Sequence, residues 1–211
     1  MKEYKLPIGC DVPETIILAD GDFPSHPLVL EWLRQCPYVV CCDGAANTYI
    51  RSGRMPEAIV GDGDSLLPDI KERYASLIHS EAEQETNDLS KAFRFCLSQE
   101  RKRITIMGAT GKREDHTIGN VSLLADYMEQ AEVSMMTDYG IFVPIREDSM
   151  FESYIGQQIS VFNMNSTALS AEGLAYPLSV FTNWWQGTLN EALARHFIIR
   201  TEGKVLVFRV F

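Results

Sequence analysis

Residues 58–65 read AIVGDGDS, an apolar run that passes directly into a polar turn. The run is short and bounded by glycine, so it predicts a buried strand. Gly61 and Gly63 let the backbone approach a phosphate closely, and Asp62 and Asp64 can bind one hard cation together. Ordinary turns contain the same residue types, because Asp bonds its own backbone there and glycine supplies positive φ. This segment alone therefore leaves a magnesium–phosphate site and a plain turn as alternatives.

Three further polar clusters adjoin predicted strands or helices: CDGAA at 42–46, EQETND at 83–88 and GATGKREDH at 108–116. The first and third follow apolar runs, and the second opens a helical pattern that includes Leu89 and Phe93. In an open parallel α/β sheet the carboxyl ends of the strands lie along one edge, and ligands bind in the crevice there. All four clusters are therefore expected to meet at one site.

Short apolar runs alternate with helical patterns up to about residue 145. The predicted strands are 15–18, 38–41, 58–60, 104–107 and 133–137, and the predicted helices lie near 27–35, 45–52, 68–75, 88–98 and 116–129. This alternation is typical of βαβ units. It predicts an N-terminal α/β domain over residues 1–146 with a mainly parallel, Rossmann-like sheet.

The helical period disappears from residue 148 onward. The segments 158–162, 169–172, 197–201 and 205–210 alternate or run apolar between Gly, Asn and Ser turns. Antiparallel strands have this pattern. Residues 147–211 are therefore predicted to form a small all-β sandwich that packs closely against the first domain.

Composition narrows the class of protein. The chain has 211 residues, and 45% of them are hydrophobic, so it can bury a substantial core. The formal net charge is -10 and there is no basic stripe to neutralise phosphates, which argues against a nucleic-acid partner. No apolar run approaches about 20 residues, and residues 1–6 lack the apolar core of a signal peptide. We therefore predict a cytoplasmic location and no membrane partner.

The order and spacing of the polar clusters resemble the thiamine pyrophosphokinase family over nearly the whole chain. The family pattern is D-G-A, G-D-x-D-S, D-Q-D-x-T-D, G-x-x-G-x-R-x-D-H and, near the C-terminus, G-x-S-N-E. The matching residues here are 43–45, 61–65, 83–88, 108–116 and 187–191. Asn87 stands in place of a Thr, and both residues can cap a helix. Leu189 stands in place of a Ser in the thiamine-binding segment.

The resemblance implies a thiamine diphosphokinase, which moves the diphosphoryl group of ATP to the hydroxyl of thiamine and releases AMP. It implies Mg²⁺ bound by Asp62, Asp64 and Asp88, and carboxylate oxygens suit this ion. Asp88 is otherwise explained as a helix N-terminal carboxylate stabilised by the helix dipole. Asp43 would lie near the metal or the hydroxyl as a base or orienting group, and is otherwise a turn residue before a helix.

The resemblance places ATP against Gln84, Arg113, Asp115 and His116. The glycine-rich turn at 108–116 precedes a predicted helix, whose free N–H groups and dipole favour an anion. Arg113 can hold a phosphate bidentately, and Asp115 would fix Arg113 or His116, or reach the nucleotide. His116 is otherwise a helix-start cap or a packed residue, and Gln84 would contact the nucleotide or a metal-bound water.

Thiamine is expected in the C-terminal part, against Tyr176 and Asn190. Its cationic thiazolium and flat pyrimidine call for an aromatic face and hydrogen-bonding groups. Trp184 and Trp185 are interpreted as sandwich core or interface residues. The resemblance also implies a homodimer in which the β domain of one chain completes the catalytic crevice of the other.

Two other classes of protein remain as alternatives. A metal-dependent glycosyltransferase also binds a nucleotide diphosphate through D-x-D, which would explain Asp62 and Asp64 but not R-x-D-H or the small β region. A non-catalytic nucleotide- or thiamine-binding protein is the second alternative, and Leu189 slightly favours it. Retention of all three predicted metal-binding aspartates argues against it.

Overall fold

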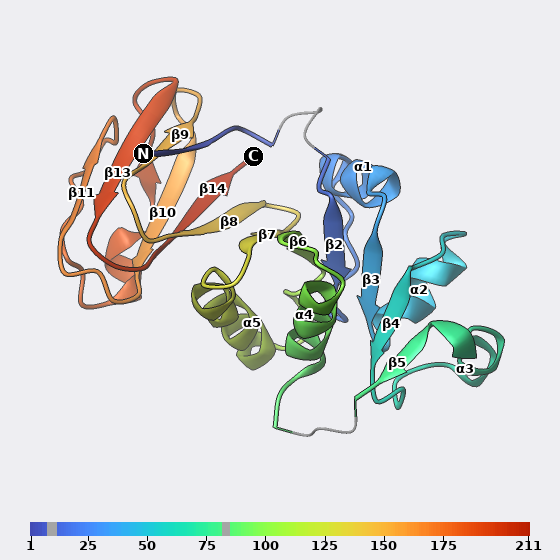
Figure 1. Cartoon of the computed structure of the whole chain (residues 1–211). Helices are drawn as coiled ribbons and strands as arrows, with labels where there is room; N and C mark the ends of the chain where they lie inside the picture. The colour runs from blue at the N-terminus through green and yellow to red at the C-terminus, as the bar shows by residue number, and fades with distance from the viewer. Residues whose placement is uncertain (8–11, 82–84) are drawn as a thin grey trace.

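The computed structural model describes residues 1–7, 12–81 and 85–211 (Figure 1). After an N-terminal strand, β1 (Lys2–Tyr4), strands alternate with helices. These elements are β2 (Thr15–Leu18), α1 (Pro27–Gln35), β3 (Val39–Cys42), α2 (Ala45–Arg51), β4 (Ala58–Gly61), α3 (Pro68–Arg73), the 3-10 helix η1 (Ala75–Leu77), β5 (Ile78–Ser80), α4 (Asp88–Ser98), β6 (Arg103–Met107), α5 (Glu114–Tyr127) and β7 (Glu132–Met136).

The rest of the described chain is almost entirely β-structure. Its elements are β8 (Gly140–Ile145), β9 (Ser149–Glu152), β10 (Gln158–Asn163), β11 (Leu169–Glu172), the 3-10 helix η2 (Trp184–Gly187), β12 (Asn190–Glu191), β13 (His196–Thr201) and β14 (Val205–Val210). The predicted division into an α/β part and a β-sandwich is confirmed. The predicted bounds 1–146 and 147–211 stay a prediction.

One sheet runs through both parts of the molecule, in the order β12-β10-β14-β8-β7-β6-β2-β3-β4-β5. Neighbouring strands from β7 to β5 are parallel. Neighbouring strands from β7 to β12 are antiparallel, and β8 joins the two halves through β7 on one side and β14 on the other. The parallel half brings the carboxyl ends of its strands to one edge, as the βαβ pattern predicts.

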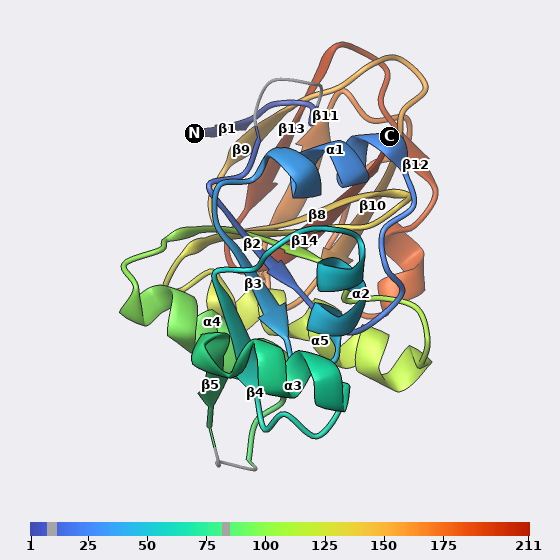
Figure 2. The same ribbon diagram turned by 90° about the vertical axis from the view of Figure 1, so that its right-hand side faces the viewer.

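Helices cover both faces of the parallel half (Figures 1 and 2). Side chains alternate along each strand, so Ile17 packs with Phe93 and Leu124 of α4 and α5, while Ile16 packs with Val29 of α1 on the other face. The parallel strands are apolar on both faces because both are covered, which is why they read as short apolar runs in the sequence.

Helix starts are specified locally. His26 caps α1 through Nδ1, which accepts a hydrogen bond from the N–H of Leu28, and Pro27 occupies the first turn. Asn87 caps α4, because its Oδ1 accepts a 2.9 Å hydrogen bond from the N–H of Ser90. The departure from the family pattern at Asn87 therefore retains the capping function expected of a Thr.

A second sheet, in the order β1-β9-β13-β11, packs against the antiparallel half of the first sheet. The core between them contains Phe151, Phe197, Val161 and Val207. The ring of Phe151 stacks on Tyr4 and on Phe197, with centroids 4.8 and 5.0 Å apart. The N-terminal strand β1 thus belongs to the sandwich, although it precedes the α/β part in the sequence.

The strands β1, β5, β8, β9 and β12 extend the predicted set. Each is brief or lies where the apolar period is interrupted, so tertiary pairing rather than local pattern defines it. None of the described helices has the length and apolar character needed to cross a membrane.

Candidate active site

The carboxyl edge of the parallel sheet contains a pocket of about 350 Å³. The turns after β2 and β3, Ser65 in the turn after β4, the loop after β6 and the starts of α4 and α5 line it. Clusters 42–46 and 108–116, together with Asn87 and Asp88, therefore meet at one site, as the sequence predicts. The rest of the 83–88 cluster does not line the pocket in the described residues, and Gln84 lies outside them.

Asp43 is the buried carboxylate of this pocket, with only 4% of its surface exposed. Its Oδ2 accepts a 3.0 Å hydrogen bond from the N–H of Ser65, whereas its buried Oδ1 has no hydrogen-bond partner among the described residues. Burial raises the pKa of Asp43, and the carboxylates of Asp88 and Asp62 raise it further. A buried acceptor oxygen in a negative environment is suited to receive a cation or a proton.

Gly61 brings the acidic residues together. A Cβ atom at this position would lie 2.8 Å from Cβ of Asp43 and 3.4 Å from Cγ of Asp88, so a side chain there would collide with the site. Glycine at the end of β4 therefore permits the close approach of three chain segments.

Asp62 and Asp64 do not line the pocket, although they adjoin it in the turn after β4. The Oδ1 of Asp62 accepts a 3.0 Å hydrogen bond from the N–H of Asp64, which is the local bond expected of an ordinary Asp turn. Within the described part of the chain, no three His, Cys, Asp or Glu side chains are grouped closely enough to hold a metal ion. Metal binding by Asp62, Asp64 and Asp88 stays a prediction.

Asp88 is the first residue of α4, and Lys91 partners it one turn later. The Nζ of Lys91 lies 3.1 Å from Oδ1 of Asp88, and the lysine side chain is buried. Sequence reasoning missed Lys91. The available signal was a cation three residues after an acid at a helix start, where the two side chains share one face.

The loop at 108–116 forms a cradle ahead of α5. Gly108 and Gly111 have φ angles of 64° and 77°, and no side chain caps the N-terminus of α5, so its first N–H groups are directed at the loop. The guanidinium of Arg113 binds Asp115 through two hydrogen bonds of 3.1 and 2.5 Å. Asp115 also accepts a 3.0 Å hydrogen bond from the N–H of His116, and these donors lower its pKa. Arg113 and His116 line the pocket, and Asp115 positions the side chain of Arg113 and binds the backbone of His116.

Asn190 has a structural role in the sandwich. Its Oδ1 accepts hydrogen bonds from the N–H groups of Tyr176 and Glu191, at 3.0 and 2.9 Å, and its Nδ2 donates a 2.8 Å bond to the carbonyl of Tyr176. The side chain is buried and ties the 173–178 segment to β12. Its contact with thiamine stays a prediction.

Several large apolar side chains near Asn190 face solvent. Trp185 is 73% exposed and Leu189 is 76% exposed, and Tyr176 and Trp184 are also exposed. Of the two alternatives for Trp184 and Trp185, burial in the sandwich core is therefore wrong, and a role at an interface stays a prediction. Trp184 touches Phe162 edge-on. Trp185 is exposed because η2 lies outside the two sheets, whereas Trp184 keeps an edge-on contact with β10 and is less exposed.

The pocket and the sandwich segment are separate within the chain. Every described residue that lines the pocket lies between Ala19 and Asn120, so neither Tyr176 nor Asn190 reaches it. Helix α5 also exposes Ile118, whereas Val121 is partly buried and Leu124 is buried, because the first half of the helix extends beyond the sheet.

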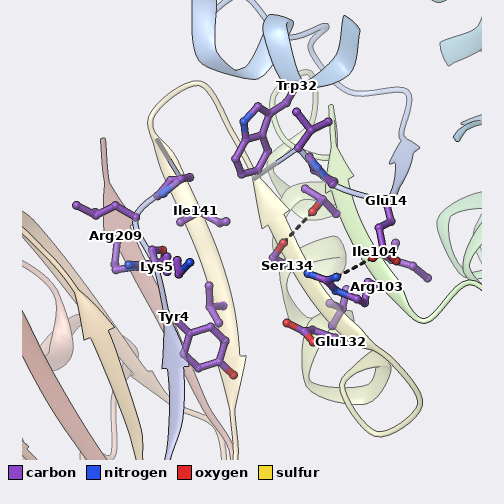
Figure 3. Close-up of a pocket in the computed structure, with 17 residues that line it drawn as sticks. Tyr4, Lys5, Glu14, Trp32, Arg103, Ile104, Glu132, Ser134, Ile141 and Arg209 are labelled. Carbon is purple, nitrogen blue, oxygen red and sulfur yellow. Dashed lines mark hydrogen bonds and ion pairs between the residues drawn. The ribbon is translucent and has the colours of Figure 1, made fainter. Parts of the chain in front are cut away.

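A second pocket of about 350 Å³ lies at the opposite ends of the parallel strands (Figure 3). Two pairs of its polar side chains bond to each other: Arg103 with Glu14 at 2.7 Å, and Thr105 with Ser134 at 3.1 Å. The amino ends of parallel strands are not the edge where α/β sheets bind ligands. The acidic, glycine-rich pocket is therefore the candidate active site.

Fold and site together define a two-part α/β protein with an anion-binding, carboxylate-containing pocket and an appended sandwich. Residues 29–136 match the family model described as "Thiamin pyrophosphokinase, catalytic domain", and residues 140–208 match "Thiamin pyrophosphokinase, substrate-binding domain". The chain belongs to the thiamine pyrophosphokinase family. These matches give no support to the glycosyltransferase alternative.

Curated relatives agree with this assignment. The chain is 30% identical to "Thiamine pyrophosphokinase 1" of Oryza sativa subsp. japonica over 129 residues, which cover 49% of each protein. It is 31% identical to "Thiamine pyrophosphokinase 2" of Arabidopsis thaliana over 155 residues, 61% of this chain and 57% of that protein. The chain thus spans about half the length of the curated relatives it matches.

Solved structures share the fold over a larger part of their length. Thiamin pyrophosphokinase from Candida albicans has a TM-score of 0.81 at 18% identity, covering 100% of this chain and 93% of that one. Thiamine pyrophosphokinase from Bacillus subtilis has a TM-score of 0.77 at 21% identity, covering 93% of this chain and 98% of that one. Both the α/β part and the sandwich of this chain therefore have counterparts in these solved structures.

Proposed function

We propose that this protein transfers the diphosphoryl group of ATP to the hydroxyl of thiamine, giving thiamine diphosphate and AMP. The observation that carries the proposal is that one pocket combines a carboxylate with an anion-binding loop. Buried Asp43 has an unpaired oxygen, and the cradle at 108–116 offers N–H groups, Arg113 and His116 to the same pocket. Diphosphoryl transfer needs such a pairing, because the phosphate chain must be held in line with an attacking hydroxyl.

ATP binding is assigned to the cradle. The N-terminus of α5 and the guanidinium of Arg113 would hold phosphate oxygens, with Asp115 maintaining the orientation of Arg113. His116 would donate to or orient the nucleotide, and Gln84 retains its predicted contact. The half-exposed position of these groups permits a ligand to enter without unfolding of the loop.

Asp43 is assigned to the thiamine hydroxyl. A carboxylate whose pKa is raised by burial is a better proton acceptor than an exposed one, and its unpaired Oδ1 is the atom available for the proton. Its Oδ2 is occupied by Ser65, which fixes the orientation of the group. Asp43 would thus orient the hydroxyl and hold its proton.

A divalent cation is assigned to Asp62, Asp64 and Asp88, whose carboxylates are the hard oxygen ligands that such an ion takes. Asp62 and Asp88 both raise the pKa of Asp43, and Asp64 is close to Asp62 in the chain. Mg²⁺ is the ion assigned to this set, and when bound it would neutralise charge on the phosphoryl oxygens. Asp88 would then contact the cation while it keeps its ion pair with Lys91.

The sandwich is assigned two roles: it would bind thiamine, and it would contact a second copy of the chain. Tyr176, Trp185 and Leu189 form an exposed apolar surface, and Asn190 fixes the backbone beneath Tyr176. Because this surface does not reach the pocket of its own chain, we assign it to the pocket of a partner copy in a homodimer. A cytoplasmic location agrees with the free thiols of Cys36, Cys41, Cys42 and Cys96.

The test is a product analysis after incubation with ATP, Mg²⁺ and thiamine. Equal amounts of AMP and thiamine diphosphate are expected, and they should require all three components. Formation of ADP would indicate transfer of a single phosphoryl group, and AMP without thiamine diphosphate would indicate hydrolysis. Either result contradicts the proposal.

A further inference from the structure

The mouth of the pocket contains an ion pair to which the proposed reaction assigns no role. The Nζ of Lys112 lies 3.0 Å from Oδ1 of Asp20, and both residues line the pocket. Their side chains are 53% and 46% exposed. Asp20 follows β2 and Lys112 follows β6, so the pair connects the ends of two adjacent parallel strands.

The backbone around this pair is tightly packed. The N–H of Gly21 donates to the carbonyl of Gly108 at 2.7 Å, and the N–H of Asp22 donates to the carbonyl of Thr110 at 2.8 Å. A Cβ atom at Gly21 would lie 2.3 Å from the oxygen of Thr110, and one at Gly111 would lie 2.0 Å from Oδ2 of Asp22. The backbone of the loop is therefore held against the first turn, whereas the half-exposed side chain of Lys112 can change its partner.

Lys112 also has an unfavourable backbone conformation. Its φ angle is 55°, in the left-handed region where a Cβ atom is crowded and glycine is preferred. Glycine would satisfy the same turn without strain. A strained lysine at the mouth of a phosphate-binding pocket points to a function for its charge.

Building on the proposed function, we propose that Lys112 determines specificity for the phosphate chain of the nucleotide by exchanging Asp20 for a phosphate oxygen of a nucleoside triphosphate. An ammonium group is a compact charge on a flexible stem, so it can move between two anions. A half-exposed ion pair is weak, which makes Asp20 easy to displace.

The exchange favours ATP over AMP. A triphosphate presents more charge and more oxygens than a monophosphate, so it competes with Asp20 where AMP does not. When only the product AMP is bound, Lys112 returns to its ion pair with Asp20, which neutralises its charge. Lys112 thus adds affinity for the triphosphate substrate and none for the product, although displacing Asp20 takes away part of that gain.

Calorimetric titration of the full chain with ATP or AMP, in Mg²⁺ and without thiamine, tests this assignment. Lys112→Gly is expected to weaken ATP binding about tenfold, the loss of one charge-assisted hydrogen bond. AMP binding should change less than twofold. Lys112→Arg should retain most of the affinity for ATP, because it keeps the charge.

A double-variant cycle separates the effect of Asp20 through its ion pair with Lys112 from the direct repulsion between the Asp20 carboxylate and the phosphates. Asp20→Asn should strengthen ATP binding several-fold in the wild-type chain and much less in the Lys112→Gly chain. Equal effects in both backgrounds, or equal losses for ATP and AMP in Lys112→Gly, would overturn the assignment. The thermal midpoint of Lys112→Gly should not fall, because glycine suits the φ angle.

Turnover distinguishes this inference from the reaction on which it rests. If wild-type protein forms no thiamine diphosphate while the ATP-to-AMP affinity ratio depends on Lys112, the proposed reaction is wrong and the specificity assignment holds. If turnover is normal and the ratio is unchanged in Lys112→Gly, the specificity assignment alone is wrong.

Discussion

The two halves of the molecule use their polar groups in opposite ways. The edge of the parallel sheet keeps a buried oxygen of Asp43 without a partner and leaves Lys112 half exposed at the mouth of the pocket. In the sandwich, Asn190 uses its oxygen and its nitrogen on neighbouring backbone, while Trp185 and Leu189 face solvent. Recognition of charge and recognition of apolar surface are therefore assigned to different parts of the chain.

Topology accounts for this division. Parallel strands must end before their crossover helices begin, so their carboxyl edge collects turns, free N–H groups and helix N-termini. Antiparallel strands return directly and pair their backbone with each other. The sandwich can therefore offer side-chain surface and few free backbone groups, which suits a flat aromatic substrate better than a phosphate.

The largest effect is expected at Asp43. Asp43→Asn should reduce turnover by about 10²–10⁴-fold, since it removes the assigned proton acceptor while keeping an oxygen for the N–H of Ser65. AMP formation from ATP and thiamine measures the loss. Asp126→Asn, an exposed change on α5, is the control and should leave the rate unaltered. Comparable activity in Asp43→Asn would remove Asp43 from the reaction.

Stability should respond in the other direction. The pKa of Asp43 is raised in the folded protein, mainly by burial, so ionisation opposes folding. That unfavourable contribution begins above the ordinary pKa of the carboxyl and is complete above the raised pKa. Without metal at neutral pH, Asp43→Asn should therefore unfold at an equal or higher urea concentration than wild type. A clear decrease would mean that Asp43 is mainly structural.

Mixed dimers test whether the two surfaces work together. A chain inactivated by Asp43→Asn and a chain inactivated by Tyr176→Ala with Trp185→Ala should recover activity when refolded together. Random assortment gives about half heterodimer, in which one of two composite sites is intact, so about a quarter of the sites should work. Native mass spectrometry verifies the exchange. Verified heterodimers without activity would place the whole site within one chain.

A smaller loss is expected at Asn190, and it should appear in stability. Asn190→Ala removes buried hydrogen bonds to the backbone of Tyr176 and should lower the free energy of unfolding by about 1–3 kcal/mol. Thr188→Ala, which loses one exposed bond in the same segment, is the matched control and should cost much less. Loss of thiamine affinity with no loss of stability would instead favour direct contact with the substrate.

The smallest effect is expected at Leu189. Leu189→Ser should lower the Michaelis constant for thiamine by several-fold and leave that for ATP unchanged, since a new hydrogen bond typically contributes about 0.5–1.5 kcal/mol. Leu189→Ala controls for the lost apolar contact. A change in the constant for ATP without one for thiamine would separate Leu189 from the thiamine site.

Much of this arrangement could be predicted from local sequence. The apolar runs around Ile17 and Val60 specify parallel strands, and the glycines at 61 and 108 mark where turns approach each other. The edge of the sheet then brings the polar clusters together without any further information. The family pattern adds roles to those residues, so the fold and the position of the pocket follow from order and spacing.

Other features depend on contacts that are remote in sequence. Lys91 is buried because α4 packs on the sheet, and no periodicity distinguishes it from an exposed lysine. Asn190 resembles a ligand-binding residue until its bonds to Tyr176 are seen. The outward orientation of Trp184 and Trp185 reverses the usual burial of tryptophan, because η2 lies outside the sheets.

The continuous sheet also limits how the molecule can move. Strand β8 is hydrogen-bonded to β7 on one side and to β14 on the other, so the α/β part and the sandwich share a ladder instead of a flexible linker. Bending them apart would break main-chain hydrogen bonds in series, whereas two chains in a dimer can slide or rotate across a side-chain interface. The two parts of one chain are therefore expected to move as a single rigid unit, and in the proposed homodimer any opening of the site would take place at the interface between the two chains.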